Sequence, residues 1–146
     1  MRLSTKGRYA VMAMADLARQ EGRRATSLAD IAERQEISQS YLEQLFARLR
    51  RRGLVVSARG PGGCYRLAAT AGETSIADIV LAVDEPLRAT RCMGNESKGC
   101  MKRGERCLTH ALWEEMGRQI HGYLASVSLA DVLEGRLTPQ TQAEAA

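Results

Sequence analysis

Two short helical patterns separated by a three-residue turn most constrain the fold of this chain. Ser27 is suited to cap a helix over 28–35, and the apolar spacing after the turn at 36–38 predicts a second helix over 39–52. This arrangement is typical of a helix-turn-helix, whose second helix enters the DNA major groove. The apolar stripe of that helix consists of Leu42, Leu45, Phe46 and Leu49.

The pattern changes from helical to extended immediately after Gly53. Residues 54–57 and 64–67 are predicted to be strands that flank a turn rich in glycine and proline at 59–63. This is the pattern of a wing, and Arg59 at its tip is placed to enter a minor groove, where negative potential attracts a guanidinium. The helices alone also fit an ordinary buried helical pair, but the succession of helix, turn, helix and basic hairpin favours DNA binding.

The charge of the chain is divided unevenly. Residues 1–67 hold 13 Lys and Arg against 6 Asp and Glu, whereas residues 68–146 hold 8 against 11. A basic first half followed by a mildly acidic remainder indicates a polyanionic partner for the first half only. We therefore expect double-stranded promoter DNA to be the partner.

A cationic, glycine-spaced segment of the second half carries four candidate metal ligands. Repeated glycines let the backbone bend around one centre, and nearby positive charge favours deprotonated thiols. The spacing lacks the paired CxxC motifs of structural zinc, so zinc is the alternative and widely spaced ligands favour an iron–sulfur cluster. The candidate ligands are Cys92, Cys100, Cys107 and His110.

A long apolar stripe follows these ligands, on a helix predicted to begin near Leu108. In so small a chain, this stripe is expected to pack against a second copy, which gives a homodimer. Packing on its own domain is the alternative. The stripe is formed by Leu112, Met116, Ile120, Leu124 and Val127.

The predicted fold class is mainly α with a small β-hairpin wing, a winged helix-turn-helix extended by a long C-terminal dimerisation helix. We expect a DNA-binding domain over 1–84, a cluster-binding loop over 85–107, a dimerisation helix with a short terminal helix over 108–134, and a disordered tail over 135–146. The first helix is expected to carry Tyr9, Met12, Ala13 and Leu17 along its apolar side.

Two classes of protein are disfavoured. No run approaches the roughly 18 apolar residues that span a bilayer, so we expect a cytoplasmic protein whose thiols stay reduced. The sequence also has no glycine-rich nucleotide loop, no plausible pair of acid/base carboxylates and no nucleophile motif, so it is not expected to be an enzyme. A cluster-transfer protein is the remaining alternative outside DNA binding.

Several segments closely resemble the bacterial iron–sulfur cluster regulator (IscR) family. The resemblance covers roughly residues 1–133, and the last segment matters most because general relatives share the N-terminal half without the ligands. The segments are MRLSTKGRYAV at 1–11, LADIAERQEIS at 28–38, SYLEQLFARLRRRGLV at 40–55, RGPGG at 59–63, ATRC at 89–92 and CLTHALW at 107–113.

The resemblance implies a homodimeric transcription factor that binds a [2Fe-2S] cluster through the four candidate ligands. The cluster-loaded form would repress cluster-assembly genes, the metal-free form would still bind a second class of site, and the assembly machinery would donate the cluster. Activation or repression at each promoter stays open. A zinc site, a thiol-redox site and the larger [4Fe-4S] cluster of a nitric-oxide-responsive relative are the alternatives.

On the DNA side, the resemblance implies that Ser40, Glu43 and Gln44 face base edges and that Arg59 lies in the minor groove. Glutamate can accept from cytosine and glutamine can bond adenine, so Glu43 is expected to discriminate between sequences more than to add affinity. The chain departs from the family in a longer ligand segment and in Cys64, which stands where the wing usually has glycine; a tolerated small residue is the main interpretation of Cys64. Ser38 and Tyr41 complete the predicted DNA-binding residues.

Overall fold

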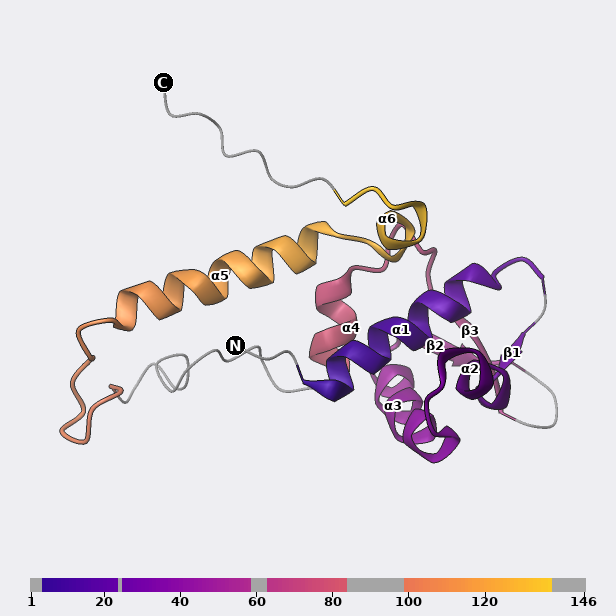
Figure 1. Cartoon of the computed structure of the whole chain (residues 1–146), viewed down its shortest axis with the longest axis horizontal. Helices are drawn as coiled ribbons and strands as arrows, with labels where there is room; N and C mark the ends of the chain where they lie inside the picture. Colours follow the sequence, from indigo (N-terminus) through magenta and orange to yellow (C-terminus); the bar gives the residue numbers. More distant parts are fainter. Residues whose placement is uncertain (1–3, 24, 59–62, 84–98, 138–146) are drawn as a thin grey trace, which may run out of the picture.

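The computed structural model describes residues 4–23, 25–58, 63–83 and 99–137. Helices α1 to α4 and α6 form one body with a small sheet at its edge, and α5 extends away from this body (Figure 1). The predicted fold class, mainly helical with a small antiparallel wing, is confirmed. The elements are α1 (Thr5–Arg19), β1 (Thr26–Ser27), α2 (Leu28–Gln35), α3 (Gln39–Arg51), β2 (Val55–Ser57), β3 (Cys64–Leu67), α4 (Ile76–Val83), α5 (His110–Ser126) and α6 (Leu129–Glu134).

Serine side chains determine where five of the helices begin. Each accepts a hydrogen bond from the backbone N–H three residues later at 3.1 Å, which satisfies a donor that the first helical turn leaves without a partner. The capping residues are Ser4 before α1, Ser27 before α2, Ser38 before α3, Ser75 before α4 and Ser128 before α6.

The turn between α2 and α3 is held by backbone geometry. Glu36 ends α2 in the left-handed region, with φ 54° and ψ 45°. Ile37 is buried, and its N–H donates to the carbonyl of Ala32 at 3.1 Å. Because Ser38 then caps α3, the chain reverses within the three residues that the sequence predicts for a helix-turn-helix.

The wing belongs to a three-stranded antiparallel sheet with the order β1-β3-β2. The predicted pairing of β2 with β3 is present, with Val56 opposite Arg66. Strand β1 was not predicted, because a two-residue strand is too short to show alternation; it pairs Ser27 with Cys64. The wing tip at 59–62 lies outside the described residues.

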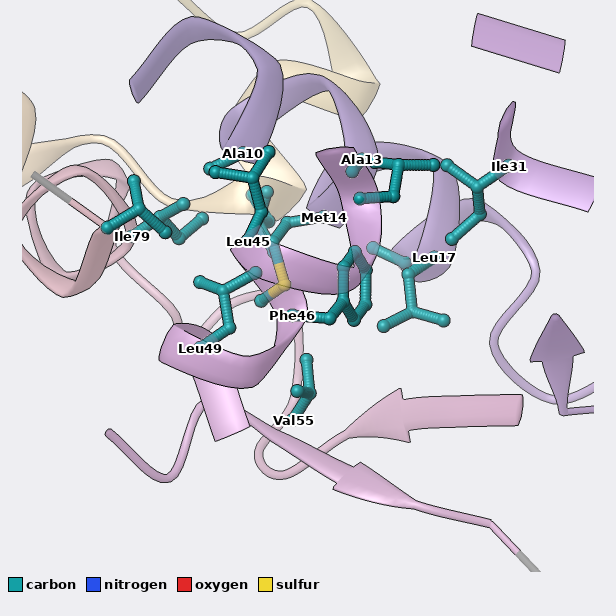
Figure 2. Close-up of a cluster of buried hydrophobic side chains, with 14 of the residues drawn as sticks. Ala10, Ala13, Met14, Leu17, Ile31, Leu45, Phe46, Leu49, Val55 and Ile79 are labelled. Carbon is teal, nitrogen blue, oxygen red and sulfur yellow. The ribbon is translucent and has the colours of Figure 1, made fainter. Parts of the chain in front are cut away.

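One apolar cluster joins α1, α3, α4 and the sheet (Figure 2). Phe46 of α3 is fully buried, and its ring centroid lies 4.9 Å from that of Tyr65 on β3. The predicted position of Met12 in the buried side of α1 is wrong: Met12 is 36% exposed, whereas Ala10 and Met14 are fully buried. The buried side of α1 follows its small alanines, which let α1 approach its neighbours closely.

A buried carboxylate connects α1 to the end of α2. The side chain of Asp16 is 3% exposed and accepts from Arg34 Nε at 2.9 Å, Arg34 Nη2 at 2.7 Å and Gln35 Nε2 at 2.8 Å. Burial alone would raise the pKa of Asp16, but hydrogen bonds from Arg34 and Gln35 and the charge of Arg34 lower the pKa below its ordinary value. The network therefore holds the last turn of α2 immediately before the turn into α3.

Asp16→Asn is expected to lower the free energy of unfolding at pH 7 by about 1–2 kcal/mol, a modest value because Arg34 is 39% exposed and partly screened by water. The pKa is depressed in the folded state, so the stabilisation is present above the ordinary pKa near 3.9 and is lost as the pH falls through the folded value. Urea titrations between about pH 7 and pH 3 should show the difference from wild type shrinking below about pH 4. Glu73→Gln, which removes an exposed carboxylate, is the control; a constant difference for Asp16→Asn at all pH values would contradict the assignment.

Candidate DNA-binding surface and metal centre

The exposed face of α3 carries three of the residues predicted to read bases. Ser40, Glu43 and Gln44 are all exposed, because the apolar stripe of α3 faces the core on the other side. Ser38 Oγ lies 3.3 Å from Ser40 Oγ, so the cap of α3 is adjacent to this face. The arrangement presents hydroxyl, carboxylate and amide groups together at the N-terminal half of the helix.

Tyr41 differs from these residues in its surroundings. It is half-buried, and its ring packs edge-on against Tyr9 of α1, with centroids 5.9 Å apart and an interplanar angle of 87°. This contact fixes the start of α3 against α1. Arg59, the predicted minor-groove residue, lies outside the described residues.

The basic C-terminal part of α3 contains a contact that sequence reasoning missed. Arg48 is exposed overall, like Arg50 and Arg51. Its Nη1 nevertheless donates to the carbonyl oxygen of Val83, the last residue of α4, at 2.6 Å. No sequence signal marks this contact, because the acceptor is a backbone carbonyl 35 residues away.

Two of the candidate metal ligands lie together before and at the start of α5. Cys100 Sγ is 3.1 Å from His110 Nδ1, and the backbone N–H of Cys107 donates to Cys100 Sγ at 3.3 Å. A tight turn brings these residues together, with Met101 N–H donating to the carbonyl of Glu105 at 3.0 Å. Cys100, Cys107 and His110 are each half-buried.

Glycine is required at Gly99 by a close approach of the backbone. A Cβ there would collide with the carbonyl oxygens of Gly104 and Glu105. Gly104 has φ 85°, a conformation that other residues rarely adopt. Two glycines of the sequence thus serve the predicted purpose, which is to bend the backbone so that the ligands approach one another.

The donor pair fits a thiolate–imidazole metal site. Bond lengths of about 2.3 Å to sulfur and 2.0 Å to nitrogen place two ligands of one tetrahedral metal about 3.5 Å apart, close to the observed separation of Cys100 Sγ and His110 Nδ1. Within the described parts of the chain, no three His, Cys, Asp or Glu side chains are grouped closely enough to hold a metal ion. Cys92, the remaining predicted ligand, lies outside those parts.

Thr109 and Trp113 form a hydrogen-bonded pair beside the third cysteine. Thr109 precedes α5 but makes no capping hydrogen bond. Its Oγ1 accepts from Trp113 Nε1 at 3.0 Å and lies 3.8 Å from Cys107 Sγ. The four-residue spacing within CLTHALW is the sequence signal that would have found this pair, since such residues face one side of a helix.

The predicted dimerisation stripe on α5 divides into two parts. Leu112, toward the start of the helix, is 58% exposed, whereas Met116 and Ile120 are half-buried. Leu124 packs against the core cluster of its own domain. The helix begins at His110, two residues later than predicted, and its N-terminal part projects from the body (Figure 1).

Comparison with known proteins identifies the family. The Rrf2 family, described as an iron-dependent transcriptional regulator, matches residues 3–135. The chain belongs to the Rrf2 family. The HTH-type transcriptional regulator IscR of Photorhabdus laumondii is 54% identical over 136 residues, which cover 93% of this chain and 81% of that protein. IscR of Serratia proteamaculans is 52% identical with the same coverage.

Solved structures of Rrf2 regulators share the fold. T. potens IscR gives a TM-score of 0.74 at 36% identity and covers 97% of this chain and 94% of its own. Oxidized Staphylococcus aureus CymR gives 0.73 at 34% identity and covers 92% and 97%. The resemblance to the IscR family is thereby confirmed, and the chain is a DNA-binding transcriptional regulator and not an enzyme. In the described residues, no helix is both long and apolar enough to cross a membrane.

Proposed function

We propose that this Rrf2 regulator senses cellular iron–sulfur status through a [2Fe-2S] cluster and represses cluster-assembly genes when loaded. The observation that carries this proposal is the convergence of Cys100 Sγ and His110 Nδ1 at 3.1 Å, at the start of a helix that continues to the DNA-binding body. Cys92 and Cys107 complete the proposed ligand set, and the cluster-assembly machinery would supply the cluster.

A [2Fe-2S] cluster supplies a one-electron redox centre whose presence depends on iron and sulfide supply. The chain's residues determine how such a centre behaves. One imidazole among three thiolates raises the reduction potential above that of an all-cysteine site. The Thr109 hydroxyl oxygen accepts from Trp113 Nε1 and lies 3.8 Å from the Cys107 sulfur, so the hydroxyl would donate a hydrogen bond to that sulfur when it binds iron.

The proposed DNA complex uses a homodimer. Residues 1–84 would bind DNA, residues 85–107 would hold the cluster and residues 108–134 would form the dimer contact, for which the exposed Leu112 is the clearest support. With α3 of each protomer in a major groove, half-sites should be centred about 34 Å apart or a multiple of that distance.

Anaerobic reconstitution with iron and sulfide tests the proposal. The loaded protein should show visible charge-transfer absorption and, by Mössbauer spectroscopy, a two-iron centre. Tight uptake of zinc with no such absorption would instead support the structural-zinc alternative. A four-iron Mössbauer signature would support the nitric-oxide-responsive alternative.

Glu43→Ala is expected to relax sequence preference more than it weakens binding. A base-edge contact contributes about 1–3 kcal/mol of discrimination, so the preference at one base pair should fall roughly 5- to 150-fold. Competition binding with a set of single-base operator variants measures this change. The control is Glu33→Ala, which removes an exposed carboxylate from α2 and should affect all operators alike. An unchanged ranking of operators for Glu43→Ala would show that α3 is oriented differently.

A further inference from the structure

Helix α4 is hydrogen-bonded to a different helix segment at each of its ends. At its start, the N–H of Ile76 donates to the carbonyl of Val127, the residue that ends α5, at 2.9 Å. At its end, the carbonyl of Val83 accepts from Arg48 of α3 at 2.6 Å. Helix α4 thus lies between α3 and the C-terminal end of α5 and contacts both (Figure 1).

The contact of Arg48 with Val83 has a clear physical basis. Val83 is the last residue of α4 that the structure describes. A guanidinium near the C-terminal end of a helix can donate to a backbone carbonyl there and also interacts favourably with the negative end of the helix dipole. Because the Arg48 guanidinium is hydrogen-bonded to α4, its positive charge stabilises the contact between α3 and α4.

Tight packing supports this hydrogen bond. Leu45 and Leu49 of α3 and Ile79 and Val83 of α4 are all almost completely buried and belong to one cluster; Figure 2 labels three of them. A densely packed interface does not deform continuously, so a displacement of α4 is passed to its neighbour as a shift of the helix as a whole. A change at α5 can therefore reach α3 through α4.

We propose that Arg48 is a positioning residue through which the state of the metal centre alters the DNA-recognition helix. The route runs from His110 at the start of α5, through the bond between Val127 and Ile76, along α4 and across the bond between Val83 and Arg48 into α3. This inference rests on the proposed function, and it adds the connection between the metal centre and the DNA-binding face. Arg48 acts through α4 and not by reading bases.

Arg48→Met tests the inference, because it keeps the aliphatic stem and removes the hydrogen bond. The probe is the duplex that the cluster-loaded wild type enriches from a randomised 30-base-pair library, and the measured quantity is the ratio of affinities of the loaded and metal-free forms. Allosteric couplings are typically 5- to 150-fold, and Arg48→Met should bring the ratio to within about threefold of one. Iron and sulfide content per chain should stay at the wild-type level, and Arg48→Lys should restore part of the ratio.

Arg51→Met is the matched control, since it removes an exposed positive charge from the same helix. Loss of a phosphate contact should weaken both forms equally and leave the ratio unchanged. If Arg48→Met behaves in this way too, the inference is overturned. If the wild type itself shows a ratio of one, the proposed cluster response fails together with the inference, so the two failures are distinguishable.

A second pair of variants tests the other end of α4. Proline is tolerated at the first position of a helix, so Ile76→Pro removes the N–H that bonds Val127 without breaking α4. Ile76→Ala removes at least as much of the isoleucine's apolar packing but keeps the N–H. Ile76→Pro should bring the ratio of DNA affinities of the loaded and metal-free forms well below the ratio for Ile76→Ala. Equal ratios for the two variants would show that the coupling does not pass through α4.

Discussion

Cys107→Ala is expected to lower the iron content of the reconstituted protein to less than about a tenth of the wild-type value and to remove its visible absorption. Cys107 is half-buried, and its backbone N–H donates to Cys100 Sγ, so the residue lies beside the proposed centre. Its replacement leaves too few thiolates to hold two iron atoms. Iron and sulfide assays with absorption spectroscopy measure the loss.

The matched control is Cys64→Ala. Cys64 lies on β3 opposite Ser27, in the sheet and not beside α5. Its replacement should leave iron content and absorption unchanged. If Cys107→Ala retained a full cluster while Cys64→Ala lost it, the proposed ligand set would be wrong. Circular dichroism of the metal-free variants should match that of the wild type in both cases, because neither cysteine carries the core packing.

Phe46→Ala is expected to lower the free energy of unfolding by about 3–5 kcal/mol. Phe46 is fully buried on α3 and packs against Tyr65 of the wing strand β3, so the substitution leaves a cavity where α3 meets the sheet. This is a large part of the roughly 5–15 kcal/mol that stabilises a typical domain. Urea unfolding followed by circular dichroism measures the change.

Two further variants separate packing from aromaticity at this position. Phe46→Leu retains part of the side-chain volume, so it should lower the free energy of unfolding by less than half as much as Phe46→Ala does. Tyr65→Phe keeps the ring that contacts Phe46 and should change the stability little. A cost below about 1 kcal/mol for Phe46→Ala would show that the junction of α3 with the wing collapses around the cavity.

The local elements of the fold were predictable because their signals lie within a few neighbouring residues. Ser27 and Ser128 mark helix starts, and the apolar spacing of α3 predicts its buried side correctly. The errors arise where the outcome depends on distant partners. Met12 is large and apolar, yet the neighbours of α1 pack against the face that carries Ala10 and Met14.

In the candidate site, too, the features with local sequence signals were predictable and those that depend on distant residues were not. The proximity of Cys100 and His110 follows from their spacing and from the glycines around them. The contact between Arg48 and Val83 could not be predicted, since any backbone carbonyl can serve as an acceptor and only the folded chain brings this one within reach. The network around Asp16 was missed for the same reason, because 18 residues separate it from Arg34.

The projection of α5 from the body sets a relation between movements at its two ends. A helix of 17 residues is about 25 Å long. If α5 swings about the end that contacts α4, a rotation of roughly 5° carries the His110 end through about 2 Å. Conversely, a movement of the His110 end by about the length of one metal–ligand bond rotates the opposite end of α5 by the same small angle. Such a rotation is enough to change how the side chains of α5 and α4 pack against each other.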